Sequence, residues 1–183
     1  INQIETSKLD FEKAPLKFQE TTWGDLKPGD VIRVYCGEFL PADCLILSSS
    51  EEGNICYLQT SNLDGESNLK QFQSLPEGSV ANSNEISEIV NNINFLDVNT
   101  PTPEIYNIVG KINLKNSDNS LEFDSSNCLL RGCTLRNTDF VEAMVLFTGP
   151  YTKTMLNSRK NKRKTSKLER AVNRNLPINF VVM

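Results

Sequence analysis

Three short apolar runs, each bounded by turn-forming residues, restrict the folds open to this 183-residue chain. The runs occupy residues 31–34, 44–47 and 55–60 and are rich in Val, Ile, Leu and Cys, a composition typical of short strands. Pro28-Gly29 precedes the first run, and these two residue types suit the two corners of a tight turn. Strands joined by turns at this spacing predict a fold that is mainly β.

The composition fits one folded domain with a core of its own. Hydrophobic residues make up 38% of the chain and charged residues 23%, which excludes a wholly disordered protein. No apolar run reaches the roughly 18 to 20 residues that cross a bilayer, and the mixed, polar first residues do not resemble a signal peptide. Because the chain does not begin with Met, we expect it to be a piece of a longer protein.

The chain contains no histidine, which excludes a Ser-His-Asp triad and a Cys-His nucleophile. Its odd number of cysteines, without a Cys-x-x-Cys pair, gives a zinc site no support. We expect reduced, mostly buried thiols and a reducing, cytosolic compartment. The cysteines are Cys36, Cys44, Cys56, Cys128 and Cys133.

Charge is divided unevenly along the chain. Residues 1–158 contain 11 Lys plus Arg against 22 Asp plus Glu, whereas residues 159–183 contain 8 against 1. Ser166 and Glu169 form a capping-box pattern for a short helix in this basic tail. A basic run of this kind is consistent with a solvated face, a nucleic-acid patch or a nuclear localisation signal.

Periodicity predicts the remaining elements. Residues 1–22 lack a clear pattern and are interpreted as an extended arm with at most one edge strand. An apolar spacing of three and four residues predicts a short amphipathic helix at about residues 83–92. Strands are expected at 105–114, 121–123 and 140–147, with a hairpin turn at 116–120.

An Asp-Gly-Glu loop follows the third apolar run. Gly65 allows a positive φ and a tight bend, so the loop can present the carboxylate of Glu66 at its tip. For the tripeptide alone, an ordinary Asp-Gly turn between two elements is the favoured interpretation. Its surroundings decide between these interpretations.

The surrounding sequence resembles the actuator domain of type IV P-type ATPases, the phospholipid flippases, whose signature reads Leu-Asp-Gly-Glu-Thr-Asn-Leu-Lys. Here residues 63–70 read Leu-Asp-Gly-Glu-Ser-Asn-Leu-Lys, with Ser67 in place of Thr. This Ser is also similar to the last residue of the Thr-Gly-Glu-Ser loop in cation pumps, but Asp64 and residues 68–70 fit the lipid class better. A second family segment, Arg-Gly-Cys-Thr-Leu-Arg-Asn-Thr at residues 131–138, lies about seventy residues further on.

The resemblance covers about residues 23–157, and it implies both a fold and a site. The implied fold is mainly β with small helices, a distorted jelly-roll or double-stranded β-sandwich. Glu66 is the implied catalytic residue for dephosphorylation of an aspartyl phosphate, with Asp64, Gly65 and Ser67 supporting the loop, and no metal site is implied. Residues 1–22 are then an N-terminal arm or linker, 23–157 the actuator domain, and 158–183 a basic linker towards the next transmembrane helix.

The same resemblance implies that the chain alone does not turn over ATP. It contains no Asp-Lys-Thr-Gly motif and no Walker-type Gly-x-x-x-x-Gly-Lys motif. The domain would need no cofactor, whereas the parent would use ATP and Mg²⁺. Expected partners are the phosphorylation and nucleotide-binding domains and membrane helices of the same parent chain, with a phospholipid reached through the membrane domain and an accessory subunit left open. The expected location is the cytosolic side of a membrane, within a multi-pass membrane protein.

Two other function classes remain open from the sequence. One is a regulatory or interaction module retained in a larger fusion protein, although such a module has no need to keep Asp-Gly-Glu together. The other is a β-rich nucleic-acid binder that uses the basic tail. The acidic body and the lack of basic residues interleaved with aromatics disfavour nucleic acid as a partner.

Overall fold

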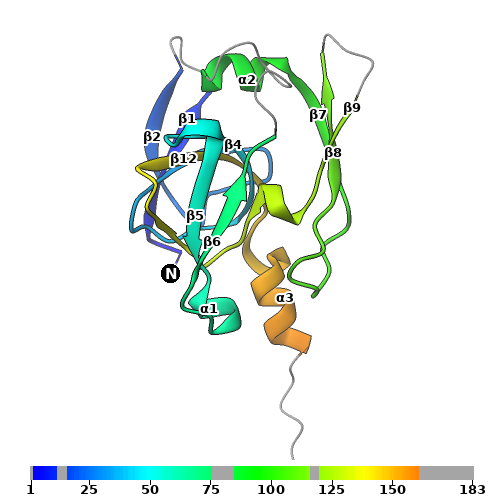
Figure 1. Cartoon of the computed structure of the whole chain (residues 1–183). Helices are drawn as coiled ribbons and strands as arrows, with labels where there is room; N and C mark the ends of the chain where they lie inside the picture. Colours follow the sequence, from blue (N-terminus) through cyan, green and yellow to red (C-terminus); the bar gives the residue numbers. More distant parts are fainter. Residues whose placement is uncertain (1, 12–15, 76–84, 116–119, 161–183) are drawn as a thin grey trace, which may run out of the picture.

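The computed structural model of the chain describes residues 2–11, 16–75, 85–115 and 120–160, and the strands within them form three antiparallel sheets (Figure 1). One sheet has six strands in the order β10-β4-β12-β3-β1-β2, and the other two have three strands each, in the orders β11-β5-β6 and β7-β8-β9. Helices are few and short. The prediction of a mainly β fold with small helices is therefore confirmed.

The six-stranded sheet carries most of the core. Its two most buried strands, β4 and β12, lie side by side, and almost every residue in them is buried. Continuous burial means that this part of the sheet is covered on both faces. The one acidic residue of β12, Glu142, is compensated because it binds the guanidinium of Arg33 and accepts a 2.5 Å hydrogen bond from the hydroxyl of Ser48. The strands are β3 (Val31–Tyr35), β4 (Asp43–Ser49), β10 (Cys128–Leu129) and β12 (Phe140–Phe147), with β1 and β2 described next.

The first 22 residues differ from the expected extended arm. They contain two paired strands, β1 (Glu5–Asp10) and β2 (Lys17–Thr22), and β1 also pairs with β3 of the large sheet. Leu9 is buried and Phe18 packs against the core and under the guanidinium of Arg33. The sequence did not predict both strands because isolated residues, and not every second residue, face the core, so the alternating apolar pattern of a strand is absent.

The sheet β11-β5-β6 carries the two family segments. It contains β5 (Ile55–Gln59), β6 (Leu69–Gln73) and β11 (Thr134–Arg136). In register, Leu58 of β5 is paired with Lys70 of β6 on one side and with Leu135 of β11 on the other. Two segments that lie about seventy residues apart in the sequence thus contribute to one sheet, on either side of β5.

The third sheet begins directly after helix α2 (Ile86–Asn92), whose buried side is formed by Ile89 with Ile86 and Val90 packed against the core. Its strands are β7 (Ile93–Val98), β8 (Gly110–Leu114) and β9 (Ser120–Phe123). The helix prediction is confirmed for residues 86–92, whereas its proposed start at 83 and the turn at 116–119 lie outside the described residues. The strand expected at 105–114 is wrong for residues 105–109, which form a loop with a turn closed by a 3.3 Å hydrogen bond from the Asn107 N–H to the Glu104 carbonyl.

The other helices are α1 (Ser61–Asp64) and α3 (Lys153–Lys160), with single 3₁₀ turns at Glu52–Asn54, Ser125–Asn127 and Gly149–Tyr151. α1 and α3 lie at the same end of the molecule (Figure 1). α3 was not predicted, and the predicted tail helix near Ser166 lies outside the described residues. All five cysteines are free thiols; Cys36 is exposed and the others are buried, as expected. In the described ranges no helix has the length and apolar character needed to cross a membrane.

Candidate functional site

The Asp-Gly-Glu loop is built by one turn of helix that ends abruptly. β5 stops at Gln59, α1 spans Ser61–Asp64, and Gly65 ends it in the left-handed conformation, with φ 76° and ψ 1°. This is the backbone that the Asp-Gly sequence predicts, and a residue with a Cβ would be strained there. The bend directs the chain into Glu66 and back towards β6.

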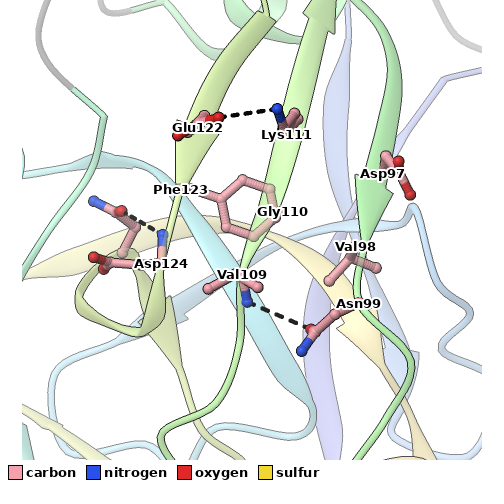
Figure 2. Close-up of a pocket in the computed structure, with 10 residues that line it drawn as sticks. Asp97, Val98, Asn99, Val109, Gly110, Lys111, Glu122, Phe123 and Asp124 are labelled. Carbon is pink, nitrogen blue, oxygen red and sulfur yellow. Dashed lines mark hydrogen bonds and ion pairs between the residues drawn. The ribbon is translucent and has the colours of Figure 1, made fainter.

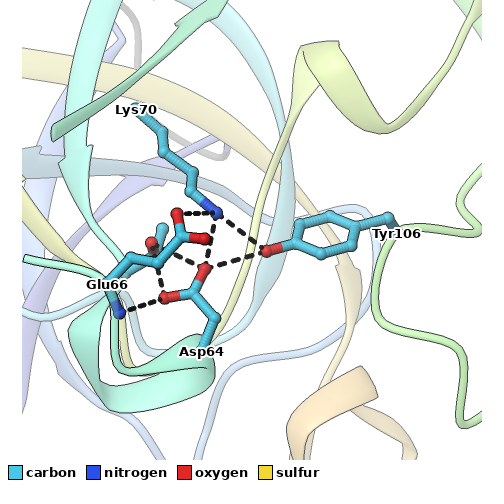
Figure 3. A network of polar contacts seen from close by, with 5 residues as sticks. Asp64, Glu66, Lys70 and Tyr106 are labelled. Carbon is cyan, nitrogen blue, oxygen red and sulfur yellow. Dashed lines mark hydrogen bonds and ion pairs between the residues drawn. The ribbon is translucent and has the colours of Figure 1, made fainter. Parts of the chain in front are cut away.

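Asp64 is the hub of the polar cluster in this loop (Figure 3). Its carboxylate accepts hydrogen bonds from the hydroxyl of Thr60 at 3.0 and 3.2 Å, and from the backbone N–H of Glu66 at 3.0 Å. It also accepts from the ammonium of Lys70 at 2.5 Å and from the hydroxyl of Tyr106 at 3.0 Å. Asp64 therefore fixes the loop from both sides of Gly65.

Lys70 contacts three other polar side chains of the cluster. Its Nζ lies 2.5 Å from Asp64 Oδ2, 3.1 Å from Glu66 Oε2 and 3.2 Å from the Tyr106 hydroxyl. An ammonium has three N–H donors, so these three acceptors use all of them. The side chain of Glu66 is 60% exposed, against 20% for Asp64, so Glu66 is the carboxylate that the loop presents to solvent.

These contacts keep both ends of the Asp64–Lys70 pair charged. The Lys70 ammonium, followed by the backbone N–H of Glu66, holds the pKa of the Asp64 carboxyl well below its usual range. Hydrogen bonds to Asp64, and then to Tyr106 and Glu66, raise the pKa of Lys70. Asp64 thus acts as a permanent anion that anchors the loop, and it is unsuited to carrying a proton near neutral pH.

Tyr106 is the member of the cluster that sequence reasoning missed. It belongs to the loop between β7 and β8 and lies 36 residues beyond Lys70 in the chain. Figure 3 shows its ring reaching across to the loop from a separate element, with the hydroxyl directed at Asp64 and Lys70. Nothing in the local sequence distinguishes this tyrosine, since its segment was interpreted as a strand.

The second family segment, residues 131–138, makes hydrogen bonds to the chain on the N-terminal side of the loop. The side-chain amide of Asn62 donates to the carbonyl of Gly132 at 3.2 Å, and the guanidinium of Arg136 donates to Gln59 at 3.1 Å. Arg131, in contrast, is turned towards the carbonyl of Gly149 at 3.1 Å. Arg136 therefore supports the end of β5 before the loop, whereas Arg131 contacts the segment before α3.

Ser67 completes the predicted set and lies exposed after Glu66. The structure thus brings Asp64, Gly65 and Glu66 into one cluster with Lys70 and leaves Ser67 at the surface beside it. Within the described ranges, no group of three or more His, Cys, Asp or Glu side chains is arranged to hold a metal ion.

A cavity of about 540 Å³ lies on a different part of the molecule, along the sheet β7-β8-β9 (Figure 2). The ring of Phe123 rests on Gly110 at its centre, where an added Cβ would come within 2.4 Å of the ring. A 2.9 Å ion pair between Lys111 and Glu122 closes one side. Its lining shares no residue with the Asp64 cluster, and we assign it no chemistry.

Comparison with known proteins identifies the family of the chain. The family described as the P-type ATPase actuator domain matches residues 11–100. The chain is 35% identical over 171 residues to "Phospholipid-transporting ATPase DNF2" of Saccharomyces cerevisiae, covering 91% of this chain and 10% of that protein. It is 36% identical over 167 residues to "Phospholipid-transporting ATPase IC" of Homo sapiens, covering 91% of this chain and 13% of that protein.

Among solved structures, the chain is similar to a zinc-transporting PIB-type ATPase, with a TM-score of 0.43 and 16% identity over 100% of this chain and 21% of that one. The chain spans about a tenth of the length of the curated relatives named above. The two family segments, the match at residues 11–100 and the identity to phospholipid-transporting ATPases agree with one another. This chain belongs to the actuator domains of the P-type ATPases.

Proposed function

We propose that the chain is the cytosolic actuator domain of an ATP-driven phospholipid flippase and that Glu66 serves the hydrolysis of its aspartyl-phosphate intermediate. One observation carries the proposal: the loop presents a single, largely exposed carboxylate, Glu66, on a backbone that Asp64 and Gly65 hold in a defined bend. Identity to proteins named phospholipid-transporting ATPases supports the choice of phospholipid as the substrate of the parent.

The proposed chemistry is the attack of water on phosphorus in line with the leaving aspartate. Little covalent help is available to such a reaction, so most of the acceleration comes from positioning and electrostatics. A carboxylate within hydrogen-bond reach of the water orients it and accepts its proton. Glu66 meets the requirement of access, because its side chain is directed into solvent from the end of a short, rigid loop.

The other loop residues act on Glu66 and not on the phosphate. Asp64 accepts the backbone N–H of Glu66 and so fixes the point from which its side chain extends. Gly65 supplies the bend, and Lys70 binds one carboxylate oxygen of Glu66. Ser67, exposed beside them, is assigned a supporting role on the strength of the family segment alone.

The rest of the transport cycle belongs to other parts of the parent. We assign ATP, Mg²⁺ and the phosphorylated aspartate to its nucleotide-binding and phosphorylation domains, and the lipid to its membrane helices. The actuator domain would lie on the cytosolic side of that membrane and couple hydrolysis to lipid movement by rotating against linkers at its two ends.

Phosphoenzyme decay in the full-length parent tests the proposal. The protein is labelled with ATP carrying a radioactive γ-phosphate and chased with unlabelled ATP, and wild type is compared with Glu66→Gln. The variant keeps the size of the side chain but cannot accept the proton, so decay should slow by roughly 10²–10⁴-fold, the usual contribution of a general base. Glu52→Gln, at an exposed glutamate of a 3₁₀ turn, is the matched control and should decay as wild type does.

Normal decay in Glu66→Gln would remove the catalytic role. A parent that forms no phosphoenzyme at all would favour the other interpretation, a regulatory module that keeps the fold without the chemistry.

A further inference from the structure

Tyr106 lies outside both family segments and still makes two of the contacts that organise the loop. Its hydroxyl donates to Asp64 Oδ2 at 3.0 Å and accepts from Lys70 Nζ at 3.2 Å. The ammonium also lies 5.5 Å from the centre of the tyrosine ring, within the range of a cation–π contact. One side chain from another part of the fold thus holds both members of the ion pair that supports Glu66.

The loop that carries Tyr106 is anchored on both sides of it. Ile108 is completely buried, and Ile105 packs against the core. The carbonyl of Asn107 accepts hydrogen bonds from the ammonium of Lys153 at 2.8 Å and from the side chain of Asn99 at 3.2 Å. The position of Tyr106 is therefore well defined, because the residues on either side of it pack into the core and bind the first residue of α3.

Lys153 is itself held in place. It is the first residue of α3, its side chain is buried, and it also donates to the hydroxyl of Thr102 at 3.1 Å. Its backbone N–H donates to the carboxylate of Asp43 at 2.6 Å. The Tyr106 loop therefore contacts the Asp-Gly-Glu loop through Tyr106 and the start of α3 through Asn107.

Glu66, in contrast, depends on Lys70 for its orientation. Its side chain is 60% exposed, and the contact that links it to the cluster is the 3.1 Å contact with Lys70 Nζ. Lys70 in turn is held by Asp64 and by the Tyr106 hydroxyl. Loss of that hydroxyl would leave one of the three ammonium donors without its acceptor and would free Lys70 to turn away from Glu66.

From this arrangement we propose that Tyr106 is a positioning residue for dephosphorylation: its hydroxyl sets the ammonium of Lys70, and through it the carboxylate of Glu66, at the place where the hydrolytic water is bound. The inference rests on the proposed function of Glu66. A catalytic group gains its effect only if neighbouring side chains hold it in the productive geometry, and Tyr106 supplies that support from a rigid element.

The test is Tyr106→Phe in the full-length parent, which keeps the ring and removes only the hydroxyl. Phosphoenzyme decay should slow by roughly tenfold, because Glu66 is misplaced but still present. The rate at which the phosphoenzyme forms and the thermal unfolding midpoint should stay at the wild-type values. Tyr151→Phe is the matched control, since Tyr151 is 62% exposed and should tolerate loss of its hydroxyl without effect.

Combining the substitution with Glu66→Gln separates positioning from a general structural role. If Tyr106 acts through Glu66, then Tyr106→Phe slows decay in the wild-type background and adds no further slowing in the Glu66→Gln background. Equal slowing in both backgrounds would overturn the inference, because Tyr106 would then act independently of Glu66.

Two further outcomes distinguish this inference from the proposed function. Slow decay in Glu66→Gln together with wild-type decay in Tyr106→Phe would overturn the role of Tyr106 and leave that of Glu66 intact. Wild-type decay in Glu66→Gln would overturn both.

Discussion

Two aspartates, Asp43 in the core and Asp64 in the exposed loop, are each associated with a lysine that comes from another element, yet they serve different ends. Asp43 is completely buried, and its oxygens accept the backbone N–H groups of Arg131 at 2.9 Å and Lys153 at 2.6 Å. Asp64 lies at the surface and is bound mainly by side chains. The first arrangement is fixed by the backbone, whereas the second depends on groups that can rotate.

Their environments shift the pKa values of the two carboxyl groups in opposite directions. Burial raises the pKa of Asp43 to about 6, although the N–H groups of Arg131 and Lys153 act against that rise. The ammonium of Lys70 lowers the pKa of Asp64. Burial of the Asp43 carboxylate therefore costs stability. In return, its hydrogen bonds attach the loop before β11 and the start of α3 to β4. The exposed carboxylate of Asp64 carries little of that cost, and it fixes the backbone N–H of Glu66.

Substitution of Asp43 should have the largest effect on stability. Asp43→Ala leaves the backbone N–H groups of the half-buried Arg131 and the buried Lys153 without an acceptor, and it should lower the free energy of unfolding of the chain by roughly 3–5 kcal/mol at pH 7. Urea unfolding followed by circular dichroism measures this change. The matched variant is Asp64→Ala, whose partners can turn to water, and it should lose clearly less. Equal losses would show that burial does not separate the two sites.

The pH dependence of stability should differ as well. Folded Asp43 has a pKa of about 6, above the ordinary value of 3.8, so between these values the folded chain binds more protons than the unfolded chain. The contribution of Asp43 to the unfolding free energy therefore becomes less favourable as pH rises from about 4 to about 6, by up to about 3 kcal/mol, and is constant above that window. Asp64 has the opposite sign, since its pKa is lowered: its contribution is present above its ordinary pKa and is lost as pH falls below that value.

The variant Asp43→Asn checks the sign, because an amide does not titrate. The unfolding free energy of wild type minus that of the variant should fall steadily between about pH 4.5 and about pH 6 and then level off. A difference that is flat, or that rises with pH, would contradict the burial of Asp43 as the cause.

The strands around both aspartates could be predicted from the sequence, because their short apolar runs and Pro-Gly turn give local signals. The runs at 31–34, 44–47 and 55–60 coincide with β3, β4 and β5, and the φ of Gly65 follows from the Asp-Gly pair. These features depend on residues next to one another in the chain. The resemblance identified both family segments, but it did not predict that they contribute strands to one sheet on either side of β5.

The contacts that complete the site have no local signal. Tyr106 reaches Asp64 across 42 residues, and Asp43 reaches Lys153 across 110. The same long-range contacts account for the wrong strand at 105–109, since the bond from Lys153 to Asn107 holds this apolar segment as a loop. The pairing of β1 and β2 was not predicted for the same reason: β1 forms on the edge of β3, and β2 forms on the edge of β1.

The smallest effect on stability is expected at Lys70, the partner of the exposed Asp64. Lys70→Met keeps the length and apolar stem of the side chain and removes its charge, so the pairs with Asp64 and Glu66 are lost. Because exposed ion pairs are weakened by salt, the variant should be slightly less stable than wild type at low ionic strength and indistinguishable from it in about 1 M NaCl, where screening acts over roughly 3 Å. Urea unfolding at both salt concentrations measures the difference.

Lys111→Met is the control, since Lys111 forms a 2.9 Å pair with Glu122 that is exposed on both sides and lies away from the loop. Both variants should show the same small, salt-dependent loss, but only Lys70→Met should slow phosphoenzyme decay in the parent. A loss of stability as large as that of Asp43→Ala and insensitive to salt would mean that Lys70 holds the fold together. The loop would then be a second structural junction, and slower phosphoenzyme decay in Lys70→Met would no longer report on the position of Glu66 alone.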